Sequence, residues 1–277
     1  MLPLHLQEVS SNLLELKYTQ LAKANLADKD QTVSSIGKAI SYMRKALSLN
    51  PKNAALQADL TNAEVYQVAF QNFVDMDWVQ AVTKLELVVT ADKNFAGGKA
   101  NALLYEAYYA LGKQYFNAGI YMDARNYLEQ AEILAWSDGN DLLKLFQVQV
   151  LLGDSIGKLD DFKNAVSYYQ YALNAIQIQN KLGSGTALYN KFSEANMLAA
   201  NGDYRAAFNT YQELLGEIEF VYTISEIEIG SGVCLALFAS ENLSTLDAVL
   251  KANNLPGNMI ISFGRELRVP SIKNQTP

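Results

Sequence analysis

The stretch YYALGKQYFNAGIYMDARNYLEQAEIL, residues 108–134, decides the fold of this chain. Small and apolar residues recur in it at helical intervals, so that Tyr108, Leu111 and Tyr115 share one face of a helix. Gly119 falls where that helix should end, because glycine readily adopts the left-handed conformation common at helix C-termini. A second helical pattern follows at once. The stretch therefore predicts two consecutive helices joined by a short turn.

The second of these helical patterns occurs five times along the chain. Each copy has a small residue followed four positions later by a large apolar one. The leading alanines are separated by 42, 43, 41 and 42 residues, a spacing that unrelated helices would have no reason to keep. They are Ala39, Ala81, Ala124, Ala165 and Ala207. The sequence therefore predicts a mostly α chain that begins as an α-α solenoid of about five helix pairs.

The third copy, with the helix before it, resembles a complete tetratricopeptide repeat. The first copy adds Pro51, where that family commonly ends its second helix. The period of about 42 exceeds the usual length of about 34, so longer helices or turns must absorb the difference. The residues at signature positions of the third copy are Tyr108, Leu111, Gly112, Tyr115, Gly119, Ala124, Leu128 and Ala131.

After residue 217 the pattern changes. Residues 220–232 (FVYTISEIEIGSG) are β-branched and aromatic, which predicts a strand, and residues 260–270 (IISFGRELRVP) predict a second one. Between them, residues 233–242 and 244–254 carry short helical patterns. We therefore expect a repeat domain over residues 1–217 and a small βααβ domain over residues 218–277.

Residues 246–270 (LDAVLKANNLPGNMIISFGRELRVP) resemble the second half of LysM domains, with Asn253, Gly264 and Leu267 in register. The first half departs from that pattern, because the usual Gly-Asp-Thr is replaced here by Gly232, Val233 and Cys234. The resemblance implies binding of N-acetylglucosamine polymers, such as peptidoglycan or chitin, through two loops. The candidate glycan-binding residues are Ser231, Gly232, Asn254, Leu255, Pro256, Gly257, Asn258 and Ile260.

The concave face of a helical solenoid is formed by the first helices of the pairs, where exposed side chains can hold a peptide or a partner helix. On this argument the candidate protein-binding residues are Tyr105, Tyr109, Gln114, Gln147 and Lys191. Packing between helices is the competing role for the tyrosines.

The composition of the chain indicates which classes of partner and which locations are disfavoured. The chain has 29 acidic and 22 basic residues, a net charge of -7, which disfavours nucleic acid. No apolar stretch is long enough to predict a membrane span, and no signal peptide is visible at the start. The single cysteine leaves the compartment open. We expect the cell envelope or an extracytoplasmic location if the LysM-like domain binds glycan.

Catalytic groups are scarce. The one histidine, His5, has no partner at metal-ligand spacing, and the glycine-rich stretch 183–188 lacks the lysine of a phosphate-binding loop. The sequence therefore predicts a non-enzymatic adaptor with no cofactor and no metal, which binds a protein through its solenoid and a glycan through its C-terminal domain. The alternative is a protein-interaction scaffold whose degenerate LysM-like domain is a structural cap.

Overall fold

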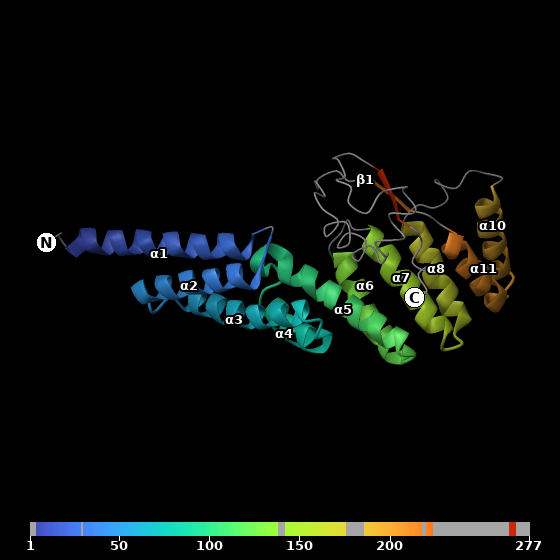
Figure 1. Cartoon of the computed structure of the whole chain (residues 1–277), viewed down its shortest axis with the longest axis horizontal. Helices are drawn as coiled ribbons and strands as arrows, with labels where there is room; N and C mark the ends of the chain where they lie inside the picture. Colours follow the sequence, from blue (N-terminus) through green and yellow to red (C-terminus); the bar gives the residue numbers. More distant parts are fainter. Residues whose placement is uncertain are drawn as a thin grey trace, which may run out of the picture. The chain divides into compact units, whose positions relative to one another are not determined.

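The computed structural model describes residues 4–28, 30–137, 142–175, 186–217, 220–223 and 266–269 (Figure 1). The chain divides into two compact units, residues 1–159 and residues 160–277. This division reflects how compactly the residues pack and does not test where one domain ends and the next begins. The expected boundary between a repeat domain and a C-terminal domain after residue 217 stays a prediction.

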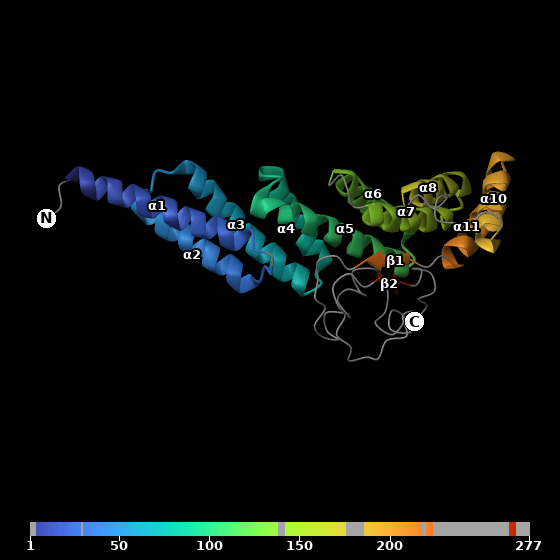
Figure 2. The same ribbon diagram turned by 90° about the horizontal axis from the view of Figure 1, so that it is seen from above.

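Unit 1 is built of helices that each contact the next helix along the chain (Figures 1 and 2). Contacts between helices further apart in sequence are few, which is the nearest-neighbour packing of a helical repeat array. The elements are α1 (Leu4–Leu26), α2 (Val33–Leu49), α3 (Ala54–Val74), α4 (Trp78–Ala91), the short 3-10 helix η1 (Phe95–Gly98), α5 (Lys99–Asn117), α6 (Tyr121–Ser137) and α7 (Leu142–Gly157).

The recurring alanines lie in the second helix of each pair and are fully buried. They are small because the neighbouring helix lies close. The third pair shows how close this approach is: a Cβ added to Gly112 of α5 would lie 2.6 Å from Cγ of Leu128 in α6. The repeat spacing of about 42 residues is longer than usual partly because the first helix of a pair is long: α1 has 23 residues and α3 has 21.

Local signals set where several helices begin and end. The Thr32 side chain accepts a hydrogen bond from the Ser35 amide, and the Ser35 hydroxyl oxygen accepts one from the Thr32 amide, so the two residues form a capping box before α2. The predicted end of α5 at Gly119 is confirmed, because the helix ends at Asn117 and Gly119 has a φ of 76°.

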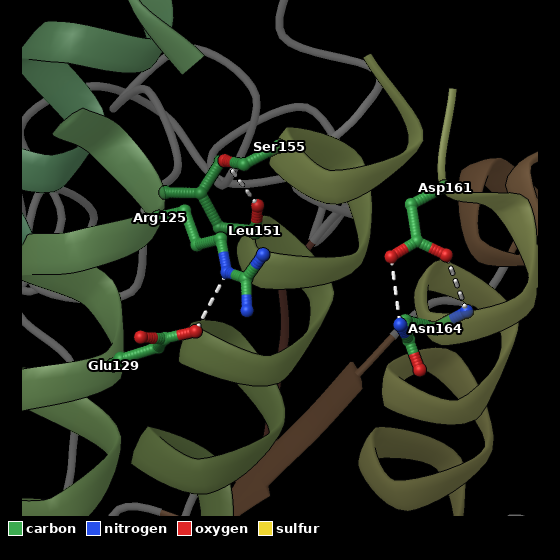
Figure 3. A network of polar contacts seen from close by, with 6 residues as sticks. All are labelled: Arg125, Glu129, Leu151, Ser155, Asp161 and Asn164. Atoms are coloured by element: carbon green, nitrogen blue, oxygen red, sulfur yellow. Dashed lines mark hydrogen bonds and ion pairs between the residues drawn. The ribbon is translucent and has the colours of Figure 1, made fainter. Parts of the chain in front are cut away.

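Unit 2 contains α8 (Phe162–Ala175), α10 (Ala187–Ala200) and α11 (Tyr204–Glu217), and α11 packs against both other helices. Asp161 caps α8, because its carboxylate accepts hydrogen bonds from the backbone and the side-chain amide of Asn164 (Figure 3). The hydroxyl of buried Tyr211 donates to Asn196 Oδ1 at 2.7 Å and ties α11 to α10.

The predicted fold class is wrong in its C-terminal part. The described chain is built of ten α-helices and η1, and a βααβ LysM-like domain is not found in it. Of the two expected strands the structure describes four residues each, β1 (Phe220–Thr223) and β2 (Glu266–Val269), which pair antiparallel; the other residues of both lie outside the described part of the chain. The two expected helices lie outside the described residues. A run of β-branched residues is weak evidence for a LysM-like domain, because strand preference depends on neighbouring strands and burial more than on the backbone.

Candidate functional site

The predicted groove residues of unit 1 are mostly inside it. Tyr105 and Tyr109 of α5 are 3% and 5% exposed, and Gln147 of α7 is 6% exposed, so these three side chains offer a partner almost no surface. Gln114, near the end of α5, is exposed. The groove as a binding surface stays a prediction, and Gln114 is the member that unit 1 presents to solvent.

The buried tyrosines join α5 to the start of α7. The rings of Tyr105 and Tyr109 stack with centroids 6.2 Å apart, and Lys144 Nζ lies 4.8 Å from the centre of the Tyr105 ring. The Tyr105 hydroxyl also donates to the Lys144 carbonyl at 3.2 Å. Burial, with Glu106 and Asp154 nearby, raises the pKa of Tyr109 well above its usual value. These tyrosines serve packing, the competing role considered for them.

Two buried polar side chains of α7 have hydrogen-bond partners within unit 1, although Gln149 Oε1 itself has none among the described residues. The Ser155 hydroxyl donates to the Leu151 carbonyl one turn earlier, at 2.8 Å (Figure 3). The side-chain amide of Gln149 donates to Glu132 of α6 at the same distance. Figure 3 also shows the Arg125–Glu129 ion pair along α6. These contacts are intrahelical or between neighbouring helices, so they hold the repeat together and do not form a ligand site.

Lys191, the predicted groove residue of unit 2, also has a structural role. Its Nζ lies 2.7 Å from Glu217 Oε1 and 3.1 Å from Glu213 Oε2, which ties α10 to the end of α11. Hydrogen bonds to Glu217 and Glu213 raise the pKa of the amine. All candidate glycan-binding residues, from Ser231 to Ile260, lie outside the described residues.

A site that the sequence did not single out lies at η1, between α4 and α5. The segment 92–98 (DKNFAGG) turns through left-handed conformations: φ is 56° at Ala96, 70° at Gly97 and 87° at Gly98. Glycine adopts these angles freely, whereas alanine does so at a cost, so Ala96 needs support from its surroundings. This turn brings η1 against the end of α1.

The turn borders a pocket of about 330 Å³ that is partly open to solvent, which we call the η1 pocket. Its lining includes buried apolar side chains from α1, α2 and η1 and three charged side chains, Lys23, Asp59 and Asp92. The volume lies at the lower end of the range for small-ligand sites. The lining residues are Lys23, Leu26, Ala27, Met43, Asp59, Asp92, Asn94, Phe95, Ala96 and Gly97.

A chain of contacts fixes the pocket. The Phe95 ring meets Tyr66 of α3 edge to face at 5.5 Å. The Tyr66 hydroxyl donates to Gln31 Oε1 at 2.6 Å, and the Gln31 amide donates to the Leu26 carbonyl at 2.7 Å. The Lys99 amine donates to the Asp28 carbonyl and so links α5 to the segment after α1. These contacts join α1, α3 and α5, so the residues around the pocket are part of the packing of unit 1.

The charges of the η1 pocket are available to a ligand. Within the described parts of the chain, neither Lys23 nor Asp59 has an ion-pair or hydrogen-bond partner for its side chain. Asp92 accepts one hydrogen bond, from the Asn94 amide at 2.9 Å, and keeps its other oxygen open. Two carboxylates against one amine leave the pocket negative on balance, which favours a cationic group.

Sequence reasoning missed this pocket although one signal for it was present. The cluster Asp92, Asn94, Gly97 and Gly98 is typical of a loop with left-handed residues. Nothing in the local sequence indicates that this loop returns to α1, because that contact joins residues far apart in the chain.

Comparison with protein-family models and with curated proteins finds no match to this chain. Among the residues that the structure describes, no group of three or more His, Cys, Asp or Glu residues is placed to hold a metal ion. In the same residues no helix is both long and apolar enough to span a membrane.

Proposed function

We propose that this chain is a helical-repeat binding protein that holds a protein partner by a lysine or arginine side chain inserted into the η1 pocket. It acts by binding, and no catalytic step is part of the proposal. The observation that carries it is the pocket itself, which combines apolar lining residues with two open carboxylates, Asp59 and Asp92. Helical repeat proteins commonly serve as scaffolds for other proteins, which supports the same conclusion.

The chemistry of the pocket matches a basic side chain. Lysine and arginine have long apolar stems and a charged end, and they bury the stem while keeping the charge at a polar rim. Leu26, Met43 and Phe95 line the pocket but are only 3%, 1% and 5% exposed, so the stem gains a small apolar contact from them and the charges carry the preference. The carboxylates provide the charge partners. The net charge of -7 adds a long-range attraction that speeds encounter with a basic partner.

Glycan binding is not part of this proposed function, because the described residues do not form a LysM-like fold. Retention on insoluble peptidoglycan or chitin stays a prediction of the sequence alone. It has a direct test, a pull-down with the full chain and with the chain truncated after Gly216.

The proposal is tested with labelled peptides that share one neutral sequence and differ only at a central Lys, Arg, Met or Glu. Fluorescence anisotropy with the full chain should show the Lys and Arg peptides binding most tightly, Met more weakly and Glu least. Replacing both carboxylates, Asp59→Asn with Asp92→Asn, removes two partly exposed charge contacts worth about 0.5 kcal/mol each. We therefore expect the dissociation constant of the Lys peptide to rise about fivefold.

A matched control removes the same charge elsewhere. Asp75→Asn with Asp161→Asn lowers the negative charge by the same amount at two helix termini outside the pocket, where asparagine can still accept a hydrogen bond. This variant should bind the Lys peptide almost as well as the unchanged chain. Equal affinity for the Lys and Glu peptides, or equal loss in both double variants, would contradict the proposal.

A further inference from the structure

The outer face of α1 carries a stripe of exposed large apolar residues. Val9, Leu13 and Leu16 are 53%, 62% and 54% exposed. The N-terminal half of α1 runs past the end of α2 in both views of the chain (Figures 1 and 2). Within the described residues, the only elements that pack substantially on α1 are α2 and η1. This half of the helix therefore has little tertiary support, although isolated helices of such length are marginal in water.

The stripe lies opposite the face that α1 buries in its own unit. The inward face carries Tyr18, whose ring stacks on Tyr42 of α2 at 6.1 Å, followed by Ala22 and Leu26, which are buried. Glu15 also points this way, because its carboxylate accepts a hydrogen bond from Asn53. The fold of unit 1 therefore uses one face of α1 and leaves the apolar stripe free.

The spacing of the stripe is that of a coiled coil. Positions 9, 13, 16 and 20 alternate intervals of four, three and four residues, and Leu6 extends the series toward the N-terminus in the sequence. An average of 3.5 residues keeps the stripe facing one partner helix along its whole length. A core-facing helix would show a broader face with period 3.6. The polar Gln20 at a core position is the kind of residue that specifies register.

We propose that α1 pairs through this stripe with α1 of a second copy of the same chain. In such an isologous contact every stripe residue meets the stripe of the other copy, so apolar meets apolar. The residues beside the stripe also favour a second copy of α1 as the partner. The positions beside the stripe are Ser10, Asn12, Lys17 and Thr19, and none is acidic, although the chain carries a net charge of -7.

Two identical helices can therefore approach without facing acidic rows, whereas a coiled-coil partner of another sequence is usually selected by charges at these flanking positions. Only the single Lys17 is charged there, so the flanks present nothing for a strongly acidic or basic partner to match. The seam is short, about two heptads, so we expect a weak dimer that forms only at high protein concentration.

The test is sedimentation velocity of the full chain from low micromolar to several hundred micromolar. The mass should rise from 30.6 kDa toward twice that value. Leu13→Glu with Leu16→Glu places acidic groups in the seam and should leave only monomer at every concentration. Leu13→Gln with Leu16→Gln is a milder variant that should weaken dimerisation at least tenfold. Circular dichroism shows whether each variant keeps the helix content of the unchanged chain.

The control is Leu87→Glu, because Leu87 of α4 is equally exposed, at 57%, and lies outside the stripe. This variant should dimerise like the unchanged chain. A chain that stays monomeric at the highest concentration overturns the proposal. Dimerisation that persists in both seam variants overturns it as well, because the contact then lies elsewhere.

Discussion

Gly112→Ala tests the packing of the third helix pair, from which the fold was first inferred. Gly112 lies inside α5, where alanine is the better helix former by about 1 kcal/mol. The added methyl group would lie 2.6 Å from Cγ and 2.8 Å from Cδ2 of Leu128, a buried side chain of α6. Carbon atoms do not approach so closely, so Leu128 or the helix must move.

The two effects oppose each other, and the clash should win. Forcing an extra methyl group into a packed interior costs about 1 to 3 kcal/mol. After the gain in helix propensity, Gly112→Ala should lower the free energy of unfolding by up to about 2 kcal/mol. In a Leu128→Ala background the obstructing atoms are gone. The same change should then raise the free energy of unfolding by about 1 kcal/mol.

The measurement is urea denaturation of the four chains of this cycle, with hydrogen exchange of peptides from α5 and α6 to locate the effect. Gly37→Ala in α2 is the control, because its new Cβ would meet only the flexible end of Gln67, at 3.2 Å, so that substitution should be neutral or stabilising. A stabilising Gly112→Ala in the unchanged background would refute the close packing of α5 on α6.

Two further predictions concern buried polar groups. Tyr109→Phe should raise the free energy of unfolding by about 1 kcal/mol, because among the described residues its buried hydroxyl has no hydrogen-bond partner. Tyr211→Phe should lower the free energy of unfolding by a similar amount, because it loses the hydrogen bond to Asn196. Equal effects of the two substitutions in urea denaturation would contradict this difference between the two hydroxyls. Burial lowers the pKa of Lys113, so the amine loses its proton at a lower pH in the folded chain than in the unfolded chain. The free energy of unfolding should therefore increase as pH rises from the lowered pKa toward 10.5. Lys113→Met should be more stable at neutral pH and should lose this increase, and a parallel pH profile for both chains would show that Lys113 is not responsible.

The repeating helices could be predicted from sequence because the signal is local and repeated. Ala124 and Leu128 lie four residues apart on one helix face, and the same spacing of a small and a large residue recurs at each of the other alanines. A helix predicted from a weak copy of the pattern is therefore supported by the stronger copies. Gly119 marks a helix end through a backbone preference that needs no tertiary context.

The η1 pocket could not be predicted, because it depends on contacts between distant segments. Lys23 and Asp92 belong to different repeats, and only the left-handed turn at Gly97 brings their segments together. The groove residues Tyr105 and Tyr109 were misplaced for a related reason. A tyrosine on the first helix of a pair satisfies the same pattern whether it faces solvent or the next helix.

Hydrogen exchange of the full chain, with and without the Lys peptide, tests the proposed function most directly. Binding in the η1 pocket predicts slower exchange in the residues around it, 23–28 at the end of α1 and 92–98 through η1, with little change in α6 or α11. The Asp59→Asn, Asp92→Asn variant should lose that protection at the same peptide concentration. Protection confined to other helices, or none at a saturating concentration, would contradict the account.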